Sequence, residues 1–174
     1  MNSLTKFLAY WIRLPAELKG MKFGKNSFIA PGYDLLFVQL KGISTGDNVM
    51  IGKNAWLQTQ DNGKITIGKG TQIGRNLVAS AINEIQIGKD CLISYGVSIF
   101  DHDHDTSQKG SPMKSGLTKP EKTIIEDHCF IGAHSFILKG VHLGRHCVVG
   151  ANSVVTRSFP ANSVIAGSPA VKIK

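Results

Sequence analysis

Residues 125–155 read IEDHCFIGAHSFILKGVHLGRHCVVGANSVV and carry an aliphatic side chain at every sixth position. These anchors are Ile125, Ile131, Ile137, Leu143, Val149 and Val155. A period of six fits neither a helix, whose apolar face returns every three or four residues, nor a hairpin sheet, whose alternation is broken by varied turns. It is typical of a β-solenoid in which each hexapeptide forms a short parallel strand and a turn, and three hexapeptides complete a coil.

Two other positions of the hexad support this interpretation. The residue four after each anchor is small or of medium size until Phe159 ends the run, namely Cys129, Ser135, Val141, Cys147 and Ser153. The residue three after each anchor must turn a corner, often at positive φ, which Gly, Asn, Asp and His tolerate best. Only those four types occupy it, at Asn26, Asn48, Asn54, Gly70, Asn76, Asp90, Gly96, His102, His128, His134, Gly140, His146 and Asn152.

The register extends upstream through Phe23, Thr45, Ile51, Ile67, Ile73, Ile87, Ile93 and Ile99. It breaks at residues 34–42, 59–64 and 82–86, which we expect to form loops at the coil corners. A chain of 174 residues with a single repeat predicts one domain. We divide it into an N-terminal capping segment (1–20), β-helix coils (21–104), an inserted loop (105–122), further coils (123–165) and a C-terminal tail (166–174).

The first twenty residues contain an apolar run that is too short to cross a bilayer. Five of its side chains would share one side of a short helix: Phe7, Leu8, Trp11, Ile12 and Leu14. We expect this helix to cap the solenoid, with contact to a membrane surface as the alternative. Further apolar side chains, Phe28, Trp56, Phe130 and Phe136, are expected on the flat outer faces, where neighbouring chains would cover them.

The formal net charge of +8 indicates a polyanionic partner, which could be nucleic acid, a membrane or a phosphorylated small molecule. Nucleic acid is disfavoured because the basic residues are scattered over the corners without a binding motif or an aromatic platform. Cys91, Cys129 and Cys147 share one small, buried slot and are predicted to be packing residues. Their odd number, with no recognisable signal peptide, predicts a reducing cytoplasm.

The candidate catalytic residues lie where the repeat is interrupted. The next anchor after Ile99 is Ile125, and the excursion 105–122, DTSQKGSPMKSGLTKPEK, is the longest in the chain. Loops of that length on a rigid scaffold usually carry function. At its root stands the sequence IFDHDHD, residues 99–105. His102 falls in the corner slot and is predicted to be a turn residue, whereas His104 falls outside it and is our candidate general base.

A neutral imidazole takes a proton from a hydroxyl near neutral pH, and a nearby carboxylate fixes its tautomer. Asp101, Asp103 and Asp105 could each supply that carboxylate to His104, and the sequence does not say which. The alternative interpretation is that the DHDH run is a solvated acidic corner.

Residues 125–174 resemble the C-terminal signature of the hexapeptide-repeat acyltransferases. The likeness rests on IGA, ILKGV, VVGANSVVT and the closing PANSVIAGSPA, and it extends back to about Lys22. The DHDH step and its loop are similar to the branch that acetylates sugars in lipopolysaccharide, capsule and exopolysaccharide assembly. The resemblance implies an all-β, left-handed parallel β-helix, a homotrimer with active sites between subunits, and direct transfer of acetyl from acetyl coenzyme A.

Several residues match the family's functional positions. His104 matches the catalytic histidine, and the backbone amide of Ala133 is expected to stabilise the oxyanion. Contacts to coenzyme A are implied for Ala133, Ala151, Thr156, Arg157, Lys172 and Lys174. Two positions depart from the family's pattern: Val171 replaces a basic residue of the tail, and Phe130 replaces a tryptophan.

The family also includes γ-class carbonic anhydrases, which hold zinc with three imidazoles across a trimer interface, two of them five residues apart. That spacing is absent here, and four of the six histidines occupy the corner slot. His128 and His146 lie eighteen residues apart and are expected to stack, so we expect no metal.

The expected acceptor is a sugar hydroxyl on a nucleotide-linked or lipid-linked saccharide, selected by residues 105–122 and 59–64. Acetylation of an amino sugar or of a xenobiotic such as a streptogramin remains an alternative, as does a non-enzymatic solenoid scaffold.

Overall fold

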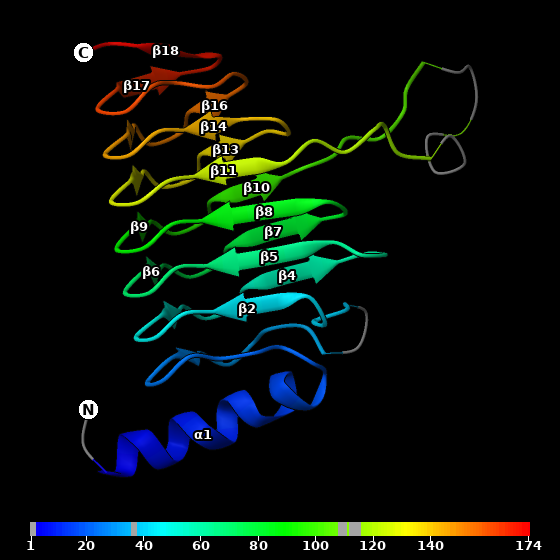
Figure 1. Ribbon diagram of the computed structural model, residues 1–174, viewed down its shortest axis with the longest axis vertical. Coiled ribbons are helices and arrows are strands. Elements are labelled where there is room, and N and C mark those ends of the chain that lie inside the picture. The colour runs from blue at the N-terminus through cyan, green and yellow to red at the C-terminus, as the bar shows by residue number, and fades with distance from the viewer. Residues whose placement is uncertain (1–2, 36–37, 108–110, 112–115) are drawn as a thin grey trace.

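The chain folds into a parallel β-helix with one helix across its N-terminal end (Figure 1). The structure is a computed structural model that describes residues 3–35, 38–107, 111 and 116–174. The residues 108–110 and 112–115 of the predicted insertion therefore lie outside the described residues. The hexapeptide β-helix predicted from the six-residue period is confirmed.

Three sheets form the sides of the coil, and their strands are parallel except for the closing β17–β18 pair. Sheet A contains β2 (Ile43–Thr45), β5 (Lys64–Ile67), β8 (Glu84–Ile87), β11 (Thr123–Ile125) and β14 (His142–Leu143). Sheet B contains β1 (Phe28–Ile29), β3 (Met50–Ile51), β6 (Gln72–Ile73), β9 (Leu92–Ile93), β12 (Phe130–Ile131), β15 (Val148–Val149), β17 (Val164–Gly167) and β18 (Ala170–Lys172). Sheet C contains β4 (Trp56–Thr59), β7 (Val78–Ala81), β10 (Ser98–Phe100), β13 (Phe136–Ile137) and β16 (Val154–Val155).

The anchor side chains fill the interior of the coil. Ile125 pairs with Leu143, and Ile131 with Val149, so each anchor lies against its equivalent one coil away. All four are fully buried. Burial of one such side chain stabilises the fold by about 1.5–3 kcal/mol. The core is therefore a continuous column of aliphatic residues along the solenoid axis.

The outward side chains differ from sheet to sheet. On sheet A the outward column is largely polar: Ser44, Thr66, Gln86, Ile124 and His142. On sheet B it is mostly apolar: Phe28, Met50, Gln72, Leu92, Phe130, Val148 and Val164. Trp56, Phe130 and Phe136 keep 37%, 38% and 42% of their surface exposed, which confirms that they face outward.

The corner residues adopt the expected left-handed backbone, with one exception. Every predicted corner residue other than His102 has a φ between 52° and 75°. The interpretation of His102 as a turn residue is therefore wrong, because the backbone has already left the coil at that point. The rings of His128 and His146 stack as predicted, with centroids 5.0 Å apart and an interplanar angle of 11°.

The three cysteines are buried as predicted, and each also makes a hydrogen bond. The Sγ atoms of Cys91, Cys129 and Cys147 donate to backbone carbonyls of the following coil, at 3.1 Å, 3.3 Å and 3.2 Å. The hydrogen bond with Cys91, together with burial, raises the pKa of the Cys129 thiol. These side chains thus connect successive coils at one corner.

Two of the three predicted corner loops are shorter than expected. β4 continues to Thr59, β5 begins at Lys64, and β8 begins at Glu84, so the loops at 59–64 and 82–86 are wrong in extent. The strands extend because Thr59 pairs with Ala81 and Lys64 with Glu84 in adjacent coils. A tight turn over residues 60–63 remains between β4 and β5.

The N-terminal helix, α1 (Ser3–Leu18), lies across the open end of the first coil (Figure 1). The Arg13 guanidinium donates to the Ser27 carbonyl at 3.1 Å, and the Tyr33 hydroxyl donates to the Ile12 carbonyl. Ala16 is fully buried. In the described part of the chain no helix is long and apolar enough to span a bilayer.

Replacing an anchor should cost far more than replacing its outward neighbour. We expect Ile87→Ala to lower the free energy of unfolding by about 2–5 kcal/mol, because Ile87 is only 1% exposed and its loss leaves a cavity. Gln86→Ala, one residue earlier on β8, should change it by less than about 0.5 kcal/mol. Urea unfolding of both variants measures the difference. Equal losses would contradict the inward and outward assignment of β8.

Candidate active site

The inserted loop leaves the coil through a two-stranded ribbon that extends from the body (Figure 1). His104 and Leu117 form an antiparallel bridge at its base. The amide of Thr118 donates to the Asp103 carbonyl at 2.8 Å, and the amide of Glu121 donates to the Asp101 carbonyl at 2.7 Å. The backbone of residues 101–105 is therefore held by pairing with residues 116–121.

Asp101 anchors this ribbon to the coil. Its side chain is fully buried, and its carboxylate accepts hydrogen bonds from the backbone amides of Ile82 and Asn83, at 2.7–3.1 Å. A third hydrogen bond joins Asp101 Oδ1 to Nδ1 of His102 at 2.7 Å. Since a carboxylate only accepts, Nδ1 of His102 carries the proton, and Nε2 of the neutral ring is left as an acceptor.

The environment of Asp101 favours its charged form. Burial alone would raise its pKa, but the hydrogen bonds from His102, Ile82 and Asn83 outweigh burial and hold the pKa of this carboxyl below its usual value. The negative charge is thus retained inside the protein, next to an imidazole whose side chain is only 11% exposed.

His104 has a different environment. Its side chain is exposed, and in the described part of the chain its imidazole has no hydrogen-bond partner. Asp103 Oδ2 instead lies 3.4 Å from Nζ of Lys139, and Asp105 accepts hydrogen bonds from Ser107. The structure thus gives the orienting carboxylate to His102 rather than to His104.

Both histidines nevertheless line one cavity of about 330 Å³. The cavity is also lined by Ser80 and Phe100, by Gly116 and Leu117 of the ribbon, and by Trp56, Gln58 and Gln60 of an earlier coil. Sequence reasoning missed Gln58 and Ser80 as site residues, whereas Gln60 lies in the segment 59–64 that was expected to select the acceptor. The parallel pairing of Gln58 with Ser80 and of Ser80 with Phe100 brings them there, and only the coil register could have indicated it.

Four of the residues implied to contact coenzyme A lie at the two ends of the strands of sheet C. Ala133 and Ala151 precede strands β13 and β16, whereas the histidines follow β10. Because the strands are parallel, Ala133 lies at the N-terminal end of the strands of sheet C and His104 lies beyond their C-terminal end in the same chain. Thr156 and Arg157 follow β16 and so lie at the same end of the strands as the histidines.

Other features of these residues bear on donor binding. The Ala133 amide donates to no acceptor within the described residues. Lys172 and Lys174 are exposed at the C-terminal end of the solenoid. Within the described ranges, no group of three or more His, Cys, Asp and Glu side chains is placed to hold a metal ion.

Lowering the pH should reduce the free energy of unfolding, because Asp101 becomes protonated. A carboxyl whose native pKa is depressed contributes stability that is present above its unfolded pKa, near 3.9, and is lost as the pH falls through its native pKa. We expect the free energy of unfolding of the wild type to fall below about pH 5, and Asp101→Asn to show a shallower fall. At pH 7 the variant should be about 1–3 kcal/mol less stable, because buried donors lose a charged acceptor.

Urea unfolding between pH 7 and pH 2.5 tests this expectation. Asp103→Asn is the matched control, because the Asp103 side chain is 51% exposed and contacts Lys139 at the surface. An Asp101→Asn profile parallel to that of the wild type would show that another group causes the acid sensitivity.

The chain is similar to several known proteins. Residues 122–157 match the family model described as the hexapeptide repeat of succinyl-transferase. A protein of Escherichia coli strain K12 named as a lipopolysaccharide biosynthesis O-acetyl transferase, WbbJ, is 34% identical over 139 residues, covering 76% of this chain and 71% of the relative. Another from the same strain, named as the colanic acid biosynthesis acetyltransferase WcaF, is 29% identical over 164 residues, covering 94% of this chain and 74% of the relative.

Solved structures show the same architecture. AntD, an N-acyltransferase from Bacillus cereus in complex with dTDP and 3-hydroxybutyryl-CoA, superposes with a TM-score of 0.78 at 26% identity. The match covers 93% of this chain and 87% of AntD.

Proposed function

We propose that this chain, which belongs to the hexapeptide-repeat acyltransferases, transfers acetyl from acetyl coenzyme A to a sugar hydroxyl during assembly of a cell-surface polysaccharide or lipopolysaccharide. The observation that carries this proposal is the cavity at the root of the inserted ribbon, where two imidazoles meet amide and hydroxyl side chains. Such side chains bind sugar hydroxyls, and an imidazole takes the proton from one of them. The named activities of WbbJ and WcaF support the same reaction.

In this proposal His104 is the general base. Its exposed imidazole accepts the proton of the acceptor hydroxyl as that oxygen attacks the thioester carbonyl. The acetyl group passes directly to the acceptor as the C–S bond of the thioester breaks, and the departing thiolate of coenzyme A takes up the proton held by His104 and leaves as the thiol. The free amide of Ala133 is proposed to stabilise the oxyanion. The Asp101–His102 pair fixes the backbone from which His104 projects.

One observation favours His102 as a second candidate for the base. Its Nδ1 atom is bound to a buried carboxylate, and this arrangement stabilises the imidazolium that proton transfer would form. The two candidates share the cavity, so single substitutions can separate them.

We further propose that the active site is completed between chains of a homotrimer. In one chain Ala133 and the two histidines are separated by the length of the strands of sheet C. A second protomer would therefore have to bring the Ala133 end of one chain next to the histidine end of another. The apolar outward columns of sheets B and C provide surface for such contacts. Coenzyme A is proposed to lie in the groove between chains, with Thr156, Arg157, Lys172 and Lys174 near its phosphates.

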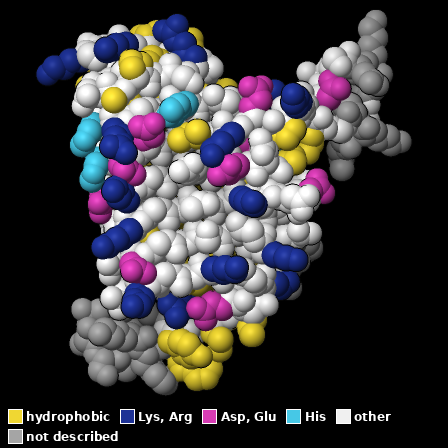
Figure 2. Space-filling view, viewed as in Figure 1, with side chains coloured by type: hydrophobic (Ala, Val, Ile, Leu, Met, Phe, Trp, Pro, Cys, Tyr) yellow, Lys and Arg dark blue, Asp and Glu magenta, His cyan; other side chains and the backbone are white. Residues whose placement is uncertain are grey.

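We place the protein in the cytoplasm, because its three thiols are free and buried, as expected in a reducing compartment. Figure 2 shows basic side chains scattered over the visible face rather than gathered in one patch. This distribution favours a small anionic partner over nucleic acid.

Loss of the base should abolish most of the turnover. We expect His104→Ala to reduce kcat about 100-fold to 10,000-fold, with little change in the KM for acetyl coenzyme A. Release of free thiol from acetyl coenzyme A, measured with a panel of sugars, reports this rate. His142→Ala, an exposed histidine on sheet A, is the matched control.

The same assay tests the alternatives. If only His102→Ala abolished turnover, His102 would be the base. If neither histidine variant reduced turnover, the mechanism would be wrong. Absence of thiol release by the wild type with every sugar and amino sugar would favour the scaffold alternative.

Charge on the apolar face should dissociate the assembly. Phe130→Glu places a carboxylate in the outward column of sheet B, where desolvation on association would be costly. Light scattering after size exclusion should give the mass of three chains for the wild type and of one chain for the variant. Gln86→Glu on sheet A should remain trimeric. A monomeric wild type would overturn the shared active site.

A further inference from the structure

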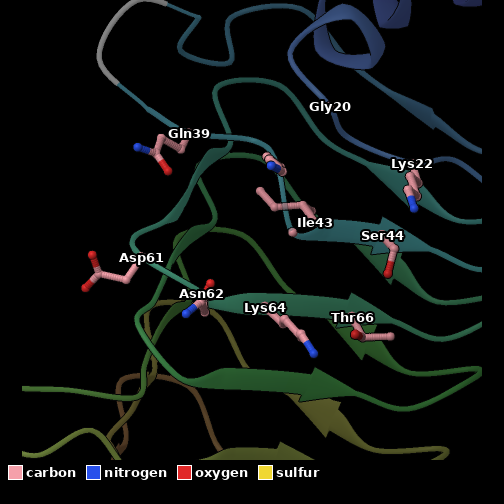
Figure 3. A pocket seen from close by; sticks show the side chains of 12 residues that line it. Gly20, Lys22, Gln39, Ile43, Ser44, Asp61, Asn62, Lys64 and Thr66 are labelled. Carbon is pink, nitrogen blue, oxygen red and sulfur yellow. The ribbon is translucent and has the colours of Figure 1, made fainter.

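A second hollow, of about 500 Å³, opens on sheet A beside the first coils. Three lysines line it, Lys22, Lys41 and Lys64, with the hydroxyls of Ser44 and Thr66 among them (Figure 3). It belongs to neither the histidine cavity nor the edges of sheet C proposed for coenzyme A. We call it the lysine pocket.

The lysine pocket is strongly positive. None of its three lysines forms an ion pair within the described residues. Glu84 pairs with Lys64 on the neighbouring strand, but its carboxylate forms an ion pair with Lys122, whose Nζ atom lies 3.0 Å away. The single carboxylate of the lining, Asp61, points away from Lys22 and Lys64 (Figure 3). With three lysines and one carboxylate in its lining, the pocket therefore has an excess of positive charge.

Gly42, one of the residues that line the pocket, allows two coils to approach each other closely. Gly42 precedes β2 and lies opposite Lys64, at a φ of 103° that side chains rarely adopt. A Cβ atom there would lie 2.5 Å from the Gly63 carbonyl oxygen. A side chain at this position would be strained and would meet the backbone of the next coil, so glycine permits the close approach of the two coils that line the pocket.

We propose that the lysine pocket binds the phosphate group of a phosphorylated saccharide. Ammonium groups from three different segments suit an anion that carries more than one negative charge and several acceptor oxygens. The hydroxyls of Ser44 and Thr66, with the amides of Gln39 and Asn62, suit the hydroxyls of an attached sugar. The choice of a saccharide rests on the proposed function, whereas the phosphate site does not.

The position of the pocket links it to the acceptor. The turn at residues 60–63 separates the two cavities: Gln60 lines the histidine cavity, while Asp61, Asn62 and Gly63 line the lysine pocket. The lysine pocket therefore holds the phosphate of a nucleotide-linked or lipid-linked acceptor and the sugar attached to it on one side of this turn, with the hydroxyl that is acetylated on the other.

Calorimetric titration tests the pocket without any acetyl transfer. The probes are inorganic phosphate, glucose 1-phosphate and glucuronate, each added to wild-type protein saturated with coenzyme A so that its own phosphate sites are filled. We expect glucose 1-phosphate to bind more tightly than inorganic phosphate and glucuronate. Lys64→Gln should weaken its binding about fivefold, and Lys22→Gln combined with Lys64→Gln should weaken it more.

Lys69→Gln is the matched control, because it removes the same charge from an exposed corner outside the pocket. It should leave binding unchanged. Equal weakening by Lys64→Gln and Lys69→Gln would show only general attraction to a basic protein and would overturn the proposal. Equal, Lys64-dependent binding of glucuronate would overturn the choice of phosphate. If the protein released no thiol from acetyl coenzyme A but still bound glucose 1-phosphate through Lys64, the proposed reaction would be wrong and the phosphate site would be supported.

Discussion

The stacking of one aliphatic side chain on its equivalent in the next coil is the constraint on which this structure depends. Ile125 on Leu143 and Ile131 on Val149 bury the anchors completely and fix the spacing of the coils. Because the interior is so thin, it admits little besides these anchors and the small corner side chains. Chemistry is therefore confined to the outer faces, the corners and the places where the chain leaves the coil.

Departure from the coil is what creates the candidate active site. The chain must leave the anchor column after Ile99, and the buried carboxylate of Asp101 secures that point by binding two amides of the preceding coil. A buried charge is tolerated only when it is fully hydrogen-bonded, so the same requirement that satisfies Asp101 also orients His102. Structural stability and the orientation of a candidate catalytic histidine thus depend on one side chain.

The three faces of the coil have different characters although their strands are built alike. Sheet B presents Met50, Leu92 and Phe130 outward and suits contact with another protein surface. Sheet A presents polar side chains, and its lysine pocket lies one turn of chain away from the histidine cavity. An acetyltransferase whose acceptor is both sugar and anion would use this corner, where a region that favours hydroxyls adjoins one that favours negative charge.

The hexad by itself determined the fold, the inward anchors, the buried cysteines and the stacking of His128 on His146, because each depends only on spacing along a regular repeat. The hexad pattern wrongly predicted that His102 is a turn residue, because the backbone has already left the coil at that position. It also could not identify Asp101 as the buried partner, or place Gln58 and Gln60 beside the histidines. Those facts depend on contacts between coils that are far apart in sequence and on the path of an insertion. Neither follows the six-residue repeat, so only the tertiary structure decided them.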